Sequence, residues 1–189
     1  EEILAAIRSD DPIAVGFSVV FENCLSDFTR LVRYLRQEGV GCHFTAGGYY
    51  ASLYPEELFG LLPELDSVVR FEGEYTLRDL VESLMAASDW RTVKSLAYHE
   101  NGKVIRTQLR GLERDLDRFP FPGRSRLGEY VPGVPYASLI TGRGCMYNCS
   151  FCNTREFYRQ AGGPLRRVRE PVEVVREMHR LYTEYGCRV

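Results

Sequence analysis

The 189-residue sequence lacks the features that mark several broad classes of protein. No apolar run approaches the roughly 18 residues that span a bilayer, so we expect no membrane contact. The acidic start, Glu1-Glu2-Ile3, lacks the basic and then apolar pattern of a secretory signal peptide. The net charge of −2 supplies no basic field that would recruit nucleic acid. We therefore expect a cytoplasmic protein that binds neither membranes nor nucleic acid.

The sequence has only six cysteines, and three of them lie within eight residues: Cys145, Cys149 and Cys152. Without an export signal, such clustering favours metal binding over disulfides. The spacing is C-x3-C-x2-C, with the aromatic Phe151 just before the last cysteine. Soft thiolates select iron–sulfur clusters or zinc. Three cysteines can hold three irons of a 4Fe–4S cluster and leave the fourth open, and an open position is typical of catalytic metal sites.

Two alternatives to the cluster remain open at this point. A structural zinc ion usually takes two closely spaced ligand pairs, so Cys187 or His179 would have to supply the fourth ligand from across a helix. The protein would then be a non-catalytic metal-binding module used for interaction. The cysteines could also be unliganded structural residues.

The first half of the chain alternates between strand and helix patterns. Apolar or β-branched runs predict strands at 13–20, 40–46 and 67–71. Helices are expected between and after them, the first capped by Ser26 and the next opened by Pro55. Short connections between such elements are typical of a doubly wound parallel sheet, so we predict an α/β fold.

The pattern changes after residue 90. Asn101-Gly102 predicts a type I′ hairpin, and a connector rich in proline and charge follows it. A new buried strand is expected at 136–141, before the cysteines, and a helix is expected to begin at Pro171. We therefore predict three segments, 1–110, a linker at 111–135, and 136–189.

The cysteine segment, preceded by Thr141-Gly142-Arg143-Gly144, resembles the signature C-x3-C-x-aromatic-C of radical S-adenosylmethionine (SAM) enzymes. The resemblance implies that 136–189 is the first β/α unit of a partial TIM barrel. It also implies that Cys145, Cys149 and Cys152 ligate a 4Fe–4S cluster, that SAM binds the open iron, and that Phe151 packs near the adenine.

In that family the reduced cluster cleaves SAM to methionine and a deoxyadenosyl radical, which abstracts hydrogen from the substrate. The implied partners are a small-molecule substrate and an electron donor such as flavodoxin or ferredoxin. Because the cofactors carry this chemistry, no side chain is assigned as catalytic. The chain lacks a starting methionine and has too few residues after 136 for a barrel of about 250 residues. We expect it to be a piece of a longer enzyme and to be inactive alone.

The first segment resembles the late part of the cobalamin-binding Rossmann-like domain that precedes many radical SAM cores. The matching residues are Gly16 to Val20, then Gly47-Gly48, and finally Glu72-Gly73-Glu74. In the family a Ser-x-Leu element precedes the Gly-Gly pair, and here Val20 replaces the leucine after Ser18.

The resemblance implies that the cofactor-binding residues of this segment are Gly16, Ser18, Gly47, Gly48 and Gly73. Glycines at the carboxyl ends of parallel strands let a flat cofactor approach the backbone. The implied reactions are cobalamin-dependent methyl transfer and radical rearrangement. A vestigial domain that binds no cobalamin is the alternative.

Overall fold

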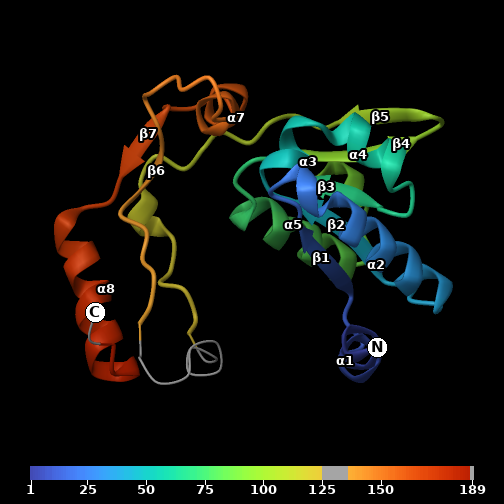
Figure 1. The fold of residues 1–189 in the computed structure, drawn as a ribbon, viewed down its shortest axis with the longest axis horizontal. Helices are drawn as coiled ribbons and strands as arrows, with labels where there is room; N and C mark the ends of the chain where they lie inside the picture. The colour runs from blue at the N-terminus through green and yellow to red at the C-terminus, as the bar shows by residue number, and fades with distance from the viewer. Residues whose placement is uncertain (125–135, 188–189) are drawn as a thin grey trace. The chain divides into compact units, whose positions relative to one another are not determined.

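The computed structural model describes residues 1–124 and 136–187. The chain divides into two compact units (Figure 1). Unit 1 comprises Glu1–Leu112 and Glu156–Gly163, and unit 2 comprises Glu113–Arg155 and Pro164–Val189. The functional bounds 1–110, 111–135 and 136–189 remain a prediction.

Unit 1 is built on a five-stranded sheet in the order β1-β2-β3-β4-β5. The first three strands run parallel and the last two are antiparallel. The register pairs Ser18 with Gly47, so the ends of β1 and β2 lie at the same level. The strands are β1 (Ala14–Ser18), β2 (His43–Gly47), β3 (Ser67–Val69), β4 (Leu96–Glu100) and β5 (Lys103–Arg106).

Side chains alternate between the two faces of the sheet along each strand. Both faces carry apolar side chains, and helices cover each of them. One face packs Phe44 and Val68 against helices α1 to α4, and the other packs Val69 and Leu96 against α5. These side chains are at least 95% buried, and each contributes about 1.5–3 kcal/mol of burial free energy. The helices are α1 (Glu2–Asp10), α2 (Leu25–Gln37), α3 (Tyr49–Leu53), α4 (Pro55–Leu61) and α5 (Glu74–Met85).

Of two local predictions from the sequence, the hairpin turn is confirmed and the helix cap is wrong. Asn101 and Gly102 both have positive φ (50° and 76°), which confirms the predicted type I′ hairpin. The prediction that Ser26 caps a helix is wrong. A 3₁₀ turn, η1 (Glu22–Cys24), runs directly into α2 at Leu25, so Ser26 already lies inside the helix.

Unit 2 contains a two-stranded antiparallel ladder of β6 (Gly142–Gly144) and β7 (Arg166–Val168), followed by helix α8 (Pro171–Tyr185). The strand predicted at 136–141 is wrong. A strand requires a hydrogen-bonded neighbour, and within the described residues the ladder with β7 begins at Gly142, preceded by a single backbone bond from the Arg169 N–H to the Thr141 carbonyl at 2.9 Å.

The sequence predicts an apolar stripe of Val172, Val175, Met178 and Leu181 on helix α8, and of these four residues only Leu181 is buried. Val172, Val175 and Met178 are each more than half exposed, whereas Glu177 and Leu181 are buried. None of the helices in the described ranges combines the length and the apolar character that crossing a bilayer demands.

At Gly48, directly after β2, both the backbone conformation and the close packing require glycine. Its φ is 103°, and a Cβ atom built there would lie 2.7 Å from the carbonyl oxygen of Val19. We predict that Gly48→Ala lowers the free energy of unfolding by about 2–3 kcal/mol, because it combines a strained φ with a backbone clash. Fluorescence of Trp90, the only tryptophan and part of unit 1, reports the denaturant midpoint.

Gly60→Ala is the matched control. Gly60 lies in α4, and no atom comes within 4 Å of the place that a Cβ atom would take, so alanine should stabilise the helix by about 0.5–1 kcal/mol. Equal stability of the two variants would contradict the account of Gly48.

Candidate functional site

A pocket opens where the parallel strands of unit 1 end. Because β1, β2 and β3 are parallel, their carboxyl ends and following loops meet at one edge, which is where α/β sheets bind ligands. The cavity measures about 320 Å³. It is lined by Gly16, Phe17, Ser18, Thr45, Ala46, Gly47, Gly48, Val69, Phe71, Gly73 and Leu77.

All five residues that the sequence assigned to cobalamin lie in this lining. The glycines leave space that side chains would fill: a Cβ atom at Gly73 would lie 3.1 Å from Val69 Cγ1, and one at Gly47 would lie 3.5 Å from the Val69 carbonyl oxygen. The pocket is thus a largely apolar cradle of exposed backbone. Such a surface fits a flat group that lies close against the chain.

The sequence analysis missed six lining residues: Phe17, Thr45, Ala46, Val69, Phe71 and Leu77. Thr45 could have been found, because it lies two residues before Gly47 on β2 and therefore faces the same side of the sheet. Leu77 lies one turn after Gly73 on α5. Phe71 carried no signal, because its place in the pocket depends on a backbone conformation that phenylalanine rarely adopts.

His43 is a packed residue on β2 and is absent from the pocket lining. Its Nε2 lies 2.8 Å from Ser67 Oγ, and its ring meets Trp90 edge to face at 4.7 Å. Burial lowers the pKa of His43, so the ring is neutral near pH 7. Its contacts account for its presence without a ligand.

The cysteine loop begins in the β6–β7 ladder. Gly144, directly before Cys145, has a φ of 86°, and a Cβ atom there would overlap the carbonyl oxygen of Leu165. Only glycine permits this close approach. After the loop, helix α7 (Thr154–Gln160) starts two residues beyond Cys152. The loop is thus fixed by regular structure on both sides.

The three cysteines are free thiols, with Cys145 partly buried and Cys149 and Cys152 exposed. The Cys152 N–H donates to the Cys149 carbonyl at 3.1 Å. Hydrogen bonds with Thr154 lower the pKa of the Cys152 thiol, whose sulfur lies 3.3 Å from Thr154 Oγ1. Phe151 is 90% exposed. Three accessible thiols on one short loop are a donor set that fits an iron–sulfur cluster.

The structure does not bring these thiols together. Across residues 1–124 and 136–187, no three Cys, His, Asp or Glu side chains converge so that they could hold a metal ion. The assignment of Cys145, Cys149 and Cys152 as ligands therefore rests on their chemistry and spacing, and it remains a proposal.

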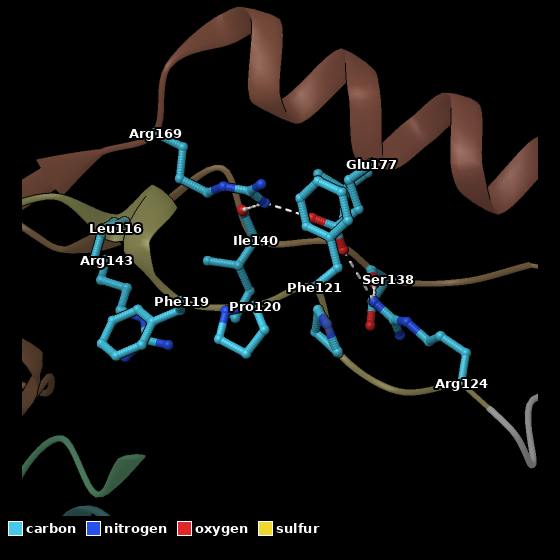
Figure 2. A pocket seen from close by; sticks show the side chains of 12 residues that line it. Leu116, Phe119, Pro120, Phe121, Arg124, Ser138, Ile140, Arg143, Arg169 and Glu177 are labelled. Atoms are coloured by element: carbon cyan, nitrogen blue, oxygen red, sulfur yellow. Dashed lines mark hydrogen bonds and ion pairs between the residues drawn. The ribbon is translucent and has the colours of Figure 1, made fainter. Parts of the chain in front are cut away.

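A second cavity, of about 230 Å³, lies in unit 2 beside a buried ion-pair network (Figure 2). Arg169 is central: its Nε donates to Asp117 Oδ1 at 2.7 Å, and its Nη1 donates to the Ile140 carbonyl at 3.1 Å and to Glu177. Arg124 reaches the other Glu177 oxygen at 3.5 Å. These contacts tie the connector and the segment before the cysteines to α8.

The buried positive and negative side chains of this network are paired with one another. The Asp117, Arg169 and Glu177 side chains are 13%, 10% and 4% exposed. Burial raises the pKa of Asp117, but hydrogen bonds from Arg169 and from the Glu170 N–H outweigh it, so the pKa lies below its ordinary value. Arg124, Arg169 and Glu177 of the network form part of the cavity lining, and their pairing with one another and with Asp117 indicates a structural role in holding α8.

Comparison with known proteins identifies a domain in the first half of the chain. A model of the B12 binding domain matches residues 1–81, which include the five glycine and serine positions of the pocket. The chain is 30% identical over 190 residues to an uncharacterized methyltransferase of Pyrococcus horikoshii, with 99% of this chain and 40% of the relative covered. It is 33% identical over 147 residues to an anaerobic magnesium-protoporphyrin IX monomethyl ester cyclase of Cereibacter sphaeroides, covering 74% of this chain and 23% of that relative.

The comparison with solved structures agrees with the comparison of sequences. The solved structure of the cobalamin-dependent SAM radical enzyme OxsB, with aqua-cobalamin and SAM bound, superposes with a TM-score of 0.77 at 24% identity. The match covers 99% of this chain and 26% of that one. The chain contains a B12-binding domain and has the fold of a cobalamin-dependent SAM radical enzyme. The predicted fold class is confirmed, and the chain spans less than half of the length of the relatives that it matches.

We predict that Arg169→Ala destabilises the helical structure of unit 2 by about 3 kcal/mol. The change leaves the buried Glu177 and Asp117 carboxylates without their partner, which is the costly way to break a buried pair. Urea unfolding followed by far-UV circular dichroism measures the loss.

Arg176→Ala is the control for this prediction. Arg176 pairs with Glu173 on the same helix, but its side chain is 61% exposed, so its removal should cost less than about 1 kcal/mol. Similar losses for the two arginines would show that the network is not a specific anchor.

Proposed function

We propose that this chain supplies the cobalamin-binding and cluster-binding parts of a radical SAM enzyme. The single observation that carries the proposal is the pocket at the carboxyl edge of β1–β3, whose lining contains every residue assigned to cobalamin from the sequence. The match of residues 1–81 to the B12 binding domain supports the same assignment.

In this proposal Cys145, Cys149 and Cys152 hold a 4Fe–4S cluster and leave one iron for SAM. When bound, the reduced cluster supplies the electron that cleaves SAM, and cobalamin supplies methyl transfer or radical rearrangement chemistry. The exposed ring of Phe151 is free to pack against the adenine of SAM. The thiols are accessible for cluster assembly, and Cys152 is the thiol whose pKa is lowered.

The pocket residues of unit 1 bind and orient the cofactor. Gly16, Gly47, Gly48 and Gly73 let it lie against the backbone, and the Ser18 hydroxyl supplies a polar contact. The largely apolar lining, with Val69 and Leu77, excludes water from the bound group.

The whole enzyme would act on a small molecule and take electrons from a donor such as flavodoxin or ferredoxin. Relatives are named as a methyltransferase and as a cyclase, so methyl transfer and radical ring closure or rearrangement are the reaction classes that we propose. The substrate pocket is expected in the remainder of the barrel.

We predict that Cys149→Ala abolishes the cluster while unit 1 stays folded. Two thiolates from this loop cannot hold a cubane at three corners. Anaerobic reconstitution, followed by iron and sulfide analysis, measures cluster content, and Trp90 fluorescence reports unit 1.

Cys24→Ala serves as the control, because Cys24 is a partly buried cysteine in unit 1, and it should retain a full cluster. A full complement of iron and sulfide in Cys149→Ala would refute the ligand assignment. One zinc and no iron in the unaltered chain would favour a metal-binding module.

We also predict that the chain retains hydroxocobalamin after desalting, at a ratio near one per chain by visible absorption. Gly47→Leu should abolish retention, because its side chain would fill the cradle beside Val69. Gly60→Leu, on the exposed side of α4, should retain the cofactor like the unaltered chain. Complete loss from the unaltered chain would indicate a vestigial domain.

A further inference from the structure

Arg70, directly after β3, is a charged side chain that is buried without an anionic partner. It is 5% exposed, and its Nε atom has neither exposed surface nor a hydrogen-bond acceptor. None of the ion pairs within the described residues includes Arg70. A buried charge is costly unless it is paired, so this guanidinium requires a physical explanation.

The charges around Arg70 do not neutralise it. Arg106 on β5 and Glu56 on α4 act on it electrostatically, but these two side chains already pair with each other at 2.5 Å. Burial lowers the pKa of Arg70, and the positive charge of Arg106 lowers it further. Because a guanidinium stays protonated in proteins, the three side chains together carry one uncompensated positive charge.

The ring of Phe71 compensates this charge only in part. The guanidinium carbon of Arg70 lies 5.0 Å from the ring centroid, which is within the range of a cation–π contact. A ring face attracts the positive charge, but it offers no acceptor to the N–H groups, which point outward in the guanidinium plane. The contact therefore holds the guanidinium in place and leaves its donors available.

The Arg70 side chain lies apart from the pocket at the carboxyl ends of β1–β3. The Arg70 N–H donates to the Ser95 carbonyl at 2.8 Å, so the chain continues the line of β3 and its side chains keep alternating. Val69 lines that pocket, whereas Arg70 is absent from its lining and shares the face of Val68, which α1 to α4 cover. A group that binds Arg70 would therefore occupy a separate site.

The available part of the guanidinium is its outer edge. Nε is the one nitrogen of this side chain that is both fully buried and unpaired, and no described residue accepts a hydrogen bond from Nη1 or Nη2. These two nitrogens are therefore open to the surface. The N–H groups of a guanidinium match the paired oxygens of a carboxylate or phosphate group, and the resulting bonds are charge-assisted.

We propose that Arg70 anchors a binding site for a small oxyanion with a single negative charge, a carboxylate or a phosphodiester. N–H groups at its outer edge donate to two oxygens of the ligand, and Arg106 adds long-range attraction while it stays paired with Glu56. One negative charge neutralises the excess charge of this cluster, whereas a dianion would reverse it. The site goes beyond the proposed use of cobalamin, because it forms without any cofactor.

The test follows urea unfolding of the full chain by Trp90 fluorescence, while sodium acetate or sodium dimethyl phosphate replaces sodium chloride at constant ionic strength. A ligand that binds only the folded state raises the urea midpoint along a saturable curve, whereas a general salt effect keeps rising with concentration. Acetate represents the carboxylate and dimethyl phosphate the phosphodiester, so the two titrations show which group the site prefers.

We expect a saturable rise in the urea midpoint of the unaltered chain with at least one of the two anions. Arg70→Met should lose this rise and be at least as stable as the unaltered chain in chloride, because it removes the unpaired buried charge. Arg70→Lys keeps the charge but not the fork, so its apparent Kd should be about tenfold weaker. Arg30→Met is the matched control, because the Arg30 side chain is 82% exposed on α2, and it should keep the rise.

A second measurement covers the case in which Arg70→Met does not fold. In the ¹⁵N-labelled unaltered chain, the amide resonances of Arg70, Phe71 and Arg106 should shift along the same saturable curve. Absence of a saturable effect with both anions would overturn the inference, as would an unchanged effect in Arg70→Met. A clear loss of stability of Arg70→Met in chloride would also overturn it, because the protein itself would then compensate the guanidinium. All of these results are obtained without cobalamin, so they leave the proposed function standing.

Discussion

The parallel register of β1, β2 and β3 is the constraint on which the candidate site depends. Pairing Ser18 with Gly47 sets the ends of two strands level, and β3 continues the same edge. Three loops then meet over a short distance and enclose the pocket. The close approach of Gly48 to the Val19 carbonyl shows how little space separates these loops. A shift of one residue would turn Ser18 and Gly47 to the opposite face.

The cysteine loop depends on different interactions. Its start is fixed in unit 2, where Gly144 lets β6 approach β7, and Arg169 anchors α8 through buried carboxylates. The residues after it, 156–163, pack within unit 1, where Phe157 joins the aromatic cluster with Tyr49 and Phe71. The residues on the two sides of the proposed ligands thus belong to different units, one stabilised by buried ion pairs and the other by aromatic packing.

Much of unit 1 could be predicted because its signals are local. Apolar runs placed the three parallel strands, and Asn101-Gly102 determined the hairpin. The glycines of the pocket were found because their positions at strand ends follow from the pattern. The sequence could not reveal Phe71, whose strained φ depends on Ser52, nineteen residues earlier in the chain.

Unit 2 was predicted less well because its structure depends on long-range contacts. Residues 136–141 have the composition of a strand, but strand formation depends on a neighbour, and only Gly142–Gly144 pairs with one. The apolar stripe of α8 suggested burial of Val172 and Met178, whereas the ion pair to Arg169 turns Glu177 inward. A buried carboxylate of this kind has no signature in helical periodicity.

The central claim is that the carboxyl edge of this sheet binds cobalamin. Amide chemical shifts of the ¹⁵N-labelled chain, recorded with and without diamagnetic hydroxocobalamin, test it residue by residue. The account predicts that the largest changes fall on Ser18, Gly47, Gly48 and Gly73, at the loops that follow β1, β2 and β3. Changes confined to other parts of the chain, or no changes at saturating cofactor, would contradict it.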